Sequence, residues 1–296
     1  MTMLDVAWAP DLIEAAVLEA LRDRPEERAL HRERDAIYEI ADPQAQDAAF
    51  AHVHASWFRR LGLATPLEDA LGELPLIAGR CARALVVRAL APRDEIADLL
   101  MASPARPTLA IRVRPETLGH AERARAFLRR ELTHVADMLD PAFGYSARVD
   151  AGAAREALLR ARYRVLWDVS VDGRLARRGH GSPDARARRW HEFRRTFAEL
   201  ADATATTFVR VWSEDRVTHA ELLALASGAR RPECPLCRLP SRDPDGVASL
   251  VPAVVDAVRA DFPSWTPEAG VCRRCAELYE ARVLTPAGRS REENER

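Results

Sequence analysis

The sequence predicts an α+β protein with a mainly helical body, a small β-sheet within that body, and a small cysteine-containing module at the carboxy terminus. Three observations support this prediction. Apolar residues recur with helical spacing over long stretches, short β-branched runs occur between residues 83 and 113, and four of the five cysteines form two Cys-x-x-Cys pairs. We therefore expect a body over residues 1–231, a module over 232–285 and a flexible tail over 286–296.

The composition is that of a globular protein rather than a disordered one. The chain has 296 residues, of which 48% are hydrophobic and 30% charged, so it can bury a substantial core. Its 44 basic residues are all arginine and are balanced by 45 acidic residues, so the overall charge indicates no polyanionic partner. The chain has neither a signal-like amino terminus nor a long uncharged apolar stretch, so we expect no membrane segment and a cytoplasmic location.

The amino-terminal part predicts helices. One is expected over residues 11–24, a second after Pro25 and a third from Pro43, where aromatic and aliphatic residues keep helical spacing over three turns. Thr65 to Glu68 has the pattern of a capping box with Pro66 at the first helical position, which predicts a further short helix.

Short apolar runs then predict the sheet. Residues 83–90 are expected to form a strand, and residues 99–102 and 109–113 a strand pair around a turn at 103–107. Cys81, just before the first of these runs, is interpreted as a small buried apolar residue rather than a nucleophile.

The stretch from Arg129 to Tyr145 begins with a two-sided helix, which Asp140-Pro141 ends. Leu128, Leu132, Val135 and Leu139 form one apolar stripe. Arg130, His134 and Asp137 line the opposite side, which is expected to be either a polar site or simply a solvated face.

The Glu131-Leu-Thr-His134 segment of this helix resembles the His-Glu-x-x-His motif of zincin metallopeptidases. In that motif two histidines one turn apart hold zinc, and the glutamate polarises a zinc-bound water. The resemblance implies that Glu131 is a general base, that His134 is a zinc ligand, and that the preceding sheet edge holds a peptide substrate. This chain departs from the motif at Arg130, which replaces the first histidine and cannot donate a lone pair to a metal.

A third ligand could come from the next helix, expected over residues 151–169. Some zincins take an acidic ligand from a later helix, which would place Asp168 or Asp172 against His134 as a second metal site. The alternative, which we favour, is a turn at residues 171–174 initiated by Asp172, with Asp168 solvated and paired with Arg164 one turn before it.

Eight arginines between Arg174 and Arg195, with Trp190 among them, have a composition that suits a nucleic-acid backbone. However, Trp190, Phe193, Phe197 and Leu200 also form the inward stripe of an amphipathic helix. We favour this second interpretation, in which the arginines lie on the outer face and pair with the acidic amino-terminal helices. Residues 208–212 are expected to form a short strand or a helix end, and a capping box at Thr218–Glu221 starts another helix.

The strongest chemical signal is a pair of Cys-x-x-Cys motifs, and their residues are Cys234, Cys237, Cys272 and Cys275. Two such pairs suit a structural zinc ion with four thiolate ligands and no open position, and the module resembles a treble clef or zinc ribbon with a helical insertion near 249–259. A redox dithiol is the alternative for either pair. The second pair is expected at a helix start, where free N–H groups favour thiolate.

Three functional hypotheses follow, and they leave open whether the protein is an enzyme. The favoured one is a zinc-binding protein whose zincin-like body has lost catalysis and binds a protein or peptide partner as a scaffold. The second is a metal-dependent peptidase that uses Glu131 and His134, with Asp137, Asp168 or Asp172 completing the site. The third is a zinc-finger protein that binds nucleic acid through Arg174 to Arg195.

Overall fold

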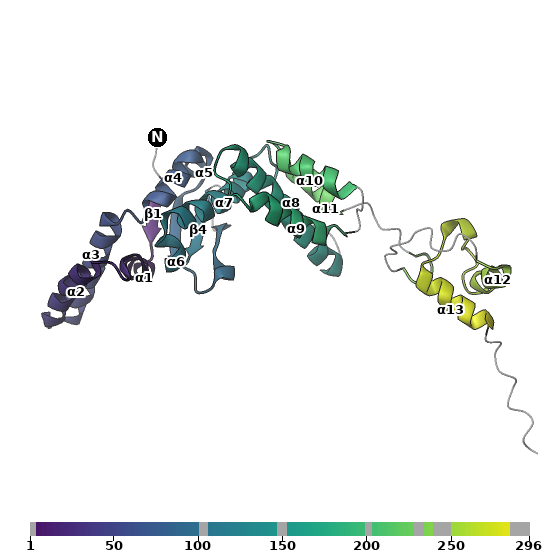
Figure 1. The fold of residues 1–296 in the computed structure, drawn as a ribbon, viewed down its shortest axis with the longest axis horizontal. Helices are drawn as coiled ribbons and strands as arrows, with labels where there is room; N and C mark the ends of the chain where they lie inside the picture. The colour runs from purple at the N-terminus through teal and green to yellow at the C-terminus, as the bar shows by residue number, and fades with distance from the viewer. Residues whose placement is uncertain are drawn as a thin grey trace, which may run out of the picture. The chain divides into compact units, whose positions relative to one another are not determined.

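The computed structural model describes residues 4–100, 106–146, 153–198, 203–227, 234–238 and 250–284. The chain divides into two compact units, Met1–Leu223 and Ala224–Arg296. The domain boundary expected at residue 231 and the tail expected from residue 286 lie outside the described residues. Helices joined to one small mixed sheet confirm the predicted α+β class (Figure 1).

The first unit contains a four-stranded sheet whose strands are β1 (Asp5–Trp8), β2 (Arg83–Arg88), β3 (Ile96–Leu100) and β4 (Thr108–Val113). The strand order is β1-β2-β4-β3, in which β3 is an edge strand antiparallel to β4 and the other neighbours are parallel. The strands expected at 83–90 and 109–113 are confirmed, whereas β3 begins three residues before the run expected at 99–102. Residues 101–102 of that run and most of the turn expected at 103–107 lie outside the described residues. Strand β1 was not predicted, because four residues are too few to show an alternating pattern.

One face of the sheet is covered. Ala84 and Val86 of β2 and Leu109 and Ile111 of β4 are buried in the main core, while Val87, on the other face, is 38% exposed. The helices of this part are α1 (Pro10–Leu21), α2 (Glu27–Asp35), α3 (Pro43–Arg60), α4 (Thr65–Glu73), α5 (Pro75–Arg80), α6 (Pro115–Leu118) and α7 (Ala121–Leu139).

The predicted helix starts are partly right. Asp42 caps α3, because its carboxylate accepts the backbone N–H groups of Gln44 and Ala45. Helix α4 forms where the Thr65 pattern predicts it, but the capping box itself is wrong: the residue before the helix is Ala64, and no side chain caps this end. Pro66, which lacks an N–H, sits in the first turn instead.

Helix α7 is the element that links the sheet to the rest of the first unit. Its apolar stripe is confirmed, since Leu128, Leu132 and Val135 are buried in the main core. The helix packs against α4 and α5 and lies along the edge strand β3, and its other side contacts α8. It ends at Asp140, as the Asp-Pro pair predicts.

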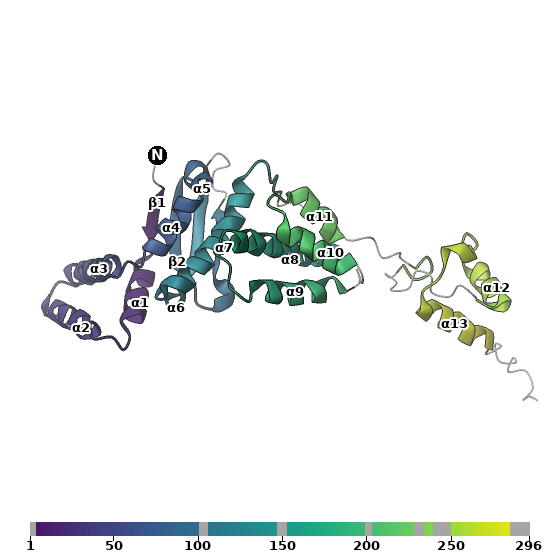
Figure 2. The same cartoon turned by 45° about the horizontal axis from the view of Figure 1, so that its top comes forward.

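Four helices follow, namely α8 (Ala153–Arg177), α9 (Ala185–Thr196), α10 (Ala203–Ser213) and α11 (His219–Ser227), and they lie together in both views (Figures 1 and 2). The inward stripe of α9 is confirmed at three positions: Phe193 and Phe197 are buried, and Trp190 packs edge-on against Phe208 of α10. Leu200 lies outside the described residues. The expectation that the arginines line the outer face is wrong for Arg189, which is buried. The capping box of α11 is confirmed too, because Thr218 and Glu221 exchange hydrogen bonds.

Helix α8 contradicts the expected turn at residues 171–174, because it continues unbroken to Arg177. Gly173 lies inside the helix rather than in a turn. A Cβ at this position would lie 2.2 Å from the carbonyl oxygen of Trp212, so glycine is needed for the close approach of α8 and α10. Close helix packing, and not a chain reversal, therefore explains this glycine.

The second unit has its own small core. Its helices α12 (Pro252–Asp261) and α13 (Arg273–Leu284) pack around Val254, Val258, Trp265 and Tyr279. The Trp265 indole donates to the carbonyl oxygen of Gly270 at 3.0 Å and so holds the segment that leads to the second cysteine pair. Across both units, none of the helices in the described ranges combines the length and the apolarity that a membrane crossing needs.

Candidate functional site

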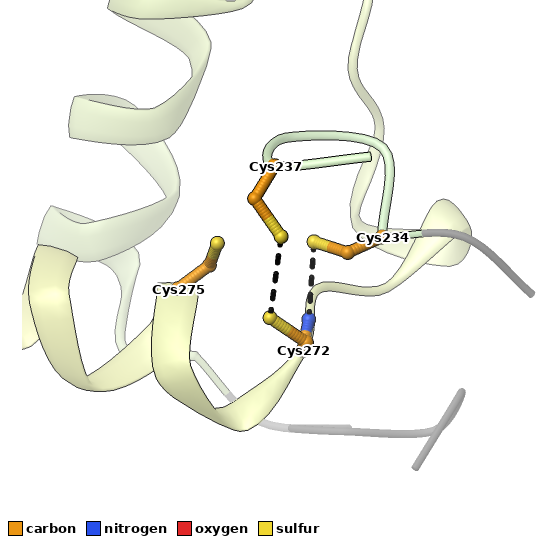
Figure 3. Close-up of side chains that lie close together, drawn as sticks. All are labelled: Cys234, Cys237, Cys272 and Cys275. Carbon is orange, nitrogen blue, oxygen red and sulfur yellow. Dashed lines mark hydrogen bonds between the residues drawn. The ribbon is translucent and has the colours of Figure 1, made fainter. Parts of the chain in front are cut away.

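The first cysteine pair lies on a tight turn. The backbone N–H of Arg238 donates to the carbonyl oxygen of Cys234 at 2.8 Å, which closes the turn over residues 234–238. Arg238 adopts a left-handed conformation, with φ of 56°, immediately after the second cysteine. Cys234 and Cys237 consequently present their sulfurs on the same side of the turn (Figure 3).

The second cysteine pair lies at the start of α13, as the sequence predicts. Cys272 directly precedes the helix, and its carbonyl oxygen accepts the N–H of Ala276 at 3.0 Å, while Cys275 lies in the first turn. The partial positive charge at a helix amino terminus attracts thiolate, but burial and the neighbouring thiols oppose this effect and raise the pKa of Cys272. Figure 3 shows the sulfurs of Cys272 and Cys275 turned toward those of the first pair.

The four sulfurs fit one tetrahedral metal ion. Their Sγ atoms all lie within 4.8 Å of one another, and the Cys237 and Cys272 sulfurs are 3.8 Å apart. A tetrahedral zinc ion with Zn–S bonds of about 2.3 Å would separate each pair of sulfurs by about 3.8 Å. Cys234, Cys237, Cys272 and Cys275 are thus placed to hold a metal ion, with all four tetrahedral positions taken by thiolate.

The surroundings of the sulfurs also suit a cation. Although burial opposes ionisation of Cys234, N–H donors of the backbone lower the pKa of its thiol to about 7. One of these donors is the N–H of Cys272, 3.3 Å from the Cys234 sulfur. Burial, together with the neighbouring thiols, raises the pKa of Cys275. A divalent cation would remove this mutual repulsion, since it attracts all four thiolates at once.

On the polar side of α7, His134 and Asp137 are buried and Arg130 is partly buried, which contradicts the alternative of a solvated face. His134 is 9% exposed and Asp137 is 6% exposed, because α8 packs over this side of the helix. A buried charged side chain is stable only when it is paired. The partners of these residues therefore determine what this side of α7 can do.

Arg130 is the central residue of this buried side. Its Nη2 lies 2.5 Å from Oδ1 of Asp168, and its Nη1 lies 2.7 Å from Oε1 of Glu131. The same Asp168 oxygen lies 3.1 Å from Nε2 of His134. The structure thus brings Asp168 to His134, while the favoured interpretation of a solvated Asp168 paired with Arg164 is wrong, because Asp168 is only 5% exposed.

Arg189 from α9 completes the arrangement. Its Nε donates to Oδ2 of Asp172 at 2.6 Å, and its Nη1 lies 3.3 Å from Oδ2 of Asp168. Asp172 is therefore a buried ion-pair partner within α8 and does not initiate a turn. Arg130, His134, Asp168, Asp172 and Arg189 are called the buried ion-pair network below.

The network keeps Asp168 ionised. Burial by itself would raise the pKa of this carboxyl group, but the hydrogen bond from His134 and the nearby guanidinium groups of Arg130 and Arg189 lower it to about 2. Two guanidinium groups thus supply positive charge at the carboxylate that would be the acidic metal ligand in a zincin-like site.

A second buried pair lies on the same side of α7. Asp137 accepts two hydrogen bonds from Arg174, at 2.8 and 2.5 Å, and one at 2.7 Å from the indole of Trp167. Trp167 also packs edge-on against His134, with ring centroids 4.7 Å apart. These contacts occupy Asp137 with side chains of α8.

Glu131 is occupied at both oxygens. Oε1 pairs with Arg130, and Oε2 accepts the backbone N–H of Ala97 in β3 at 3.4 Å. Glu131 therefore faces the edge strand of the sheet. Across the part of the chain that the structure describes, the four cysteines are the one group of three or more His, Cys, Asp or Glu side chains with ligand atoms close enough to share a metal.

The acidic residues have three partners that were not predicted from the sequence, namely Arg174, Arg189 and Trp167. One signal was available for Arg189: it lies one turn before Phe193, on the face of α9 that is buried. A cation on an apolar stripe predicts a buried carboxylate partner, because an isolated buried charge is too costly. Arg174 had no such signal, since it appeared to lie in a turn.

Comparisons with known proteins give no family assignment: no protein-family model matches the chain, and neither curated proteins nor solved structures give a match. The function of this chain is therefore inferred from its sequence and its geometry alone.

Proposed function

We propose that this protein binds one structural zinc ion through Cys234, Cys237, Cys272 and Cys275. The observation that supports the proposal is the convergence of four sulfurs within 4.8 Å, drawn from two segments 35 residues apart. Thiolate ligands favour zinc among the common divalent ions, and four of them leave no position for a substrate or water. The role of the ion is then to hold a module with a small core in its folded state.

We further propose that the body is a non-catalytic scaffold for a protein or peptide partner. The buried ion-pair network supports this, because Arg130 and Arg189 already neutralise Asp168 and Asp172. A catalytic zinc site needs three protein ligands and an open position. Here a guanidinium stands beside the acidic residue, and a bound cation would have to displace it against charge repulsion.

Cobalt substitution tests the zinc proposal. The protein is unfolded in chelator, reduced, and refolded with Co²⁺, whose absorption spectrum reports both tetrahedral geometry and thiolate ligation. We expect one equivalent of tetrahedral, thiolate-bound cobalt, displaced by one equivalent of Zn²⁺. An octahedral spectrum, or cobalt bound without sulfur-to-metal charge transfer, would reject the four-thiolate site.

A metal-dependent peptidase is the second candidate. The observation that favours it is that Nε2 of His134 lies 3.1 Å from Oδ1 of Asp168. His134 follows Glu131 by one helical turn, and Glu131 contacts the edge strand β3. Metal binding and peptide cleavage by the wild type separate the two proposals. For a scaffold we expect the wild type to bind no second metal ion and to cleave no peptide. Metal-dependent cleavage by the wild type, abolished by Glu131→Gln, would establish the peptidase instead.

A further inference from the structure

A second feature of the body is a cavity lined almost entirely by arginine. It has a volume of about 480 Å³ and lies between the carboxyl end of α8 and the segment that joins α10 to α11. Its lining residues are Arg174, Arg177, Arg178, Asp215 and Arg216. Four guanidinium groups and one carboxylate make it strongly positive, although the whole chain has a net charge of only −1.

Two of these arginines already have ion-pair partners. Arg174 pairs with Asp137. Arg177 pairs with Asp215 at 2.9 Å and also donates to the carbonyl oxygens of Trp212 and Glu214. Arg177 therefore joins the ends of α8 and α10 and is held rigidly at the wall of the cavity. The attraction of cations to the carboxyl ends of helices explains this residue without any ligand.

Arg178 directly follows α8, so the carboxyl end of that helix attracts it too, whereas Arg216 lies three residues after the end of α10. Both residues are exposed, and neither side chain forms an ion pair or a hydrogen bond within the described ranges. Arg178 lies close enough to Glu73 to contribute to the lowered pKa of that carboxyl group, but the main cause of this shift is the hydrogen bond from Arg129. Two positive charges at the cavity are thus left without an ion-pair partner within the described ranges.

Arg174, one of the lining residues, also has a buried N–H group. Arg174 uses both of its Nη atoms for Asp137, while its buried Nε has no acceptor among the described residues. A buried N–H without an acceptor is costly and often marks the place of a missing water or ion.

We propose that this cavity binds a small molecule that carries a phosphate group, with Arg178 and Arg216 as its main ligands. A phosphate monoester has a charge of about −1.5 to −2 at neutral pH, which matches the two uncompensated guanidinium groups. Guanidinium donors also fit phosphate oxygens in pairs. The volume lies within the range of sites for small organic ligands, so it leaves room for a group attached to the phosphate.

The test is isothermal calorimetry on the full chain with inorganic phosphate, pyrophosphate and adenosine monophosphate, and with adenosine as the phosphate-free control. We expect at least one phosphate-bearing probe to bind, adenosine not to bind, and the double variant Arg178→Ala/Arg216→Ala to bind that probe about tenfold more weakly or worse. These side chains have no partner in the described ranges, so the variant should keep the wild-type circular dichroism and melting temperature.

The matched control removes two exposed arginines from elsewhere, through Arg194→Ala/Arg195→Ala on the outer face of α9. We expect it to bind the probes as the wild type does. Absence of binding by all three probes up to millimolar concentration would overturn the proposal, as would equal weakening in both double variants. Single-stranded DNA binding that depends on Arg194 and Arg195, without binding of the small probes, would overturn it in favour of a nucleic-acid surface.

Discussion

Arg130 and Asp168 are 38 residues apart in the sequence, and their charged groups lie 2.5 Å apart at the contact between α7 and α8. Arg130 stands at the motif position of the first histidine ligand, and Asp168 is the residue that was a candidate for the acidic metal ligand. The Arg130 guanidinium neutralises Asp168 at the contact between α7 and α8. Unlike a catalytic metal ion, it has no coordination position for a water or a substrate. This pairing is the basis of the scaffold proposal for the body.

The pairing predicts a large cost for its removal. Arg130→Ala removes one of the two guanidinium groups that neutralise the buried Asp168 carboxylate. We expect the free energy of unfolding in urea to fall by about 2–3 kcal/mol. The control is Arg125→Ala on the same helix, where Arg125 pairs with the exposed Glu122 and with Asp69. We expect a loss of less than about 1 kcal/mol there. Equal effects of the two substitutions would count against a special role for Arg130.

Asp168 predicts a specific pH dependence. Its pKa is about 2 in the folded protein, against an ordinary value of 3.8. The ionised carboxylate therefore contributes about 2 kcal/mol to the free energy of unfolding, and this contribution is present above about pH 4. The contribution is lost as the pH falls toward 2, because the unfolded chain binds the proton more readily. We expect Asp168→Asn to be destabilised near neutral pH and to differ least from the wild type near pH 2.

Comparing the two proteins at each pH removes effects that they share, including loss of metal from protonated thiolates. A difference in unfolding free energy that stays constant down to about pH 2 would contradict the lowered pKa of Asp168.

Gly173 predicts a steric effect. Gly173→Ala places a Cβ 2.2 Å from the Trp212 carbonyl oxygen, so α8 and α10 must separate, and we expect a loss of about 3 kcal/mol in unfolding free energy. Gly72→Ala in α4 is the control, because no atom lies within 4 Å of its added Cβ. Alanine favours a helix, so this control should be neutral or gain up to about 1 kcal/mol. Similar melting temperatures for the two variants would show that α8 and α10 do not approach closely.

The cysteines predict separate roles for the module and the body. We expect Cys272→Ser to lose the metal and to lose the dispersed amide signals of α12 and α13 in NMR spectra, because metal binding supplies most of the folding free energy of such a small core. Cys81→Ala is the control, since Cys81 is fully buried in the main core of the body. It should retain the metal. Dispersed module signals after chelation would indicate that the core folds without an ion.

Local patterns predicted much of the fold. The apolar stripe of α7, the cysteine pairs and the capping box at Thr218 depend on residues near one another in sequence, so spacing alone reveals them. The predictions that were wrong concern residues whose surroundings come from other helices or strands. A helix with charged residues on one side looks the same whether that side meets water or buried counter-charges, so the burial of His134 and Asp137 was not predictable from α7 alone.

Gly173 and Asp172 show the same limit. Asp-Gly is a common turn signal, and it predicted a chain reversal where α8 in fact continues. The glycine is there because α10 passes close by, and the aspartate is there because Arg189 reaches it from α9. Neither partner is near in sequence, so the local signal was interpreted without the contacts that account for these residues.

The most direct test of the whole account is the metal content of the purified protein, measured by mass spectrometry together with that of a Cys234→Ser/Cys272→Ser variant. The account predicts about one zinc per wild-type chain and none in the variant, because guanidinium groups fill the polar side of α7. A second equivalent in the wild type, or zinc that remains in the variant and disappears only when His134→Ala is added, would contradict it.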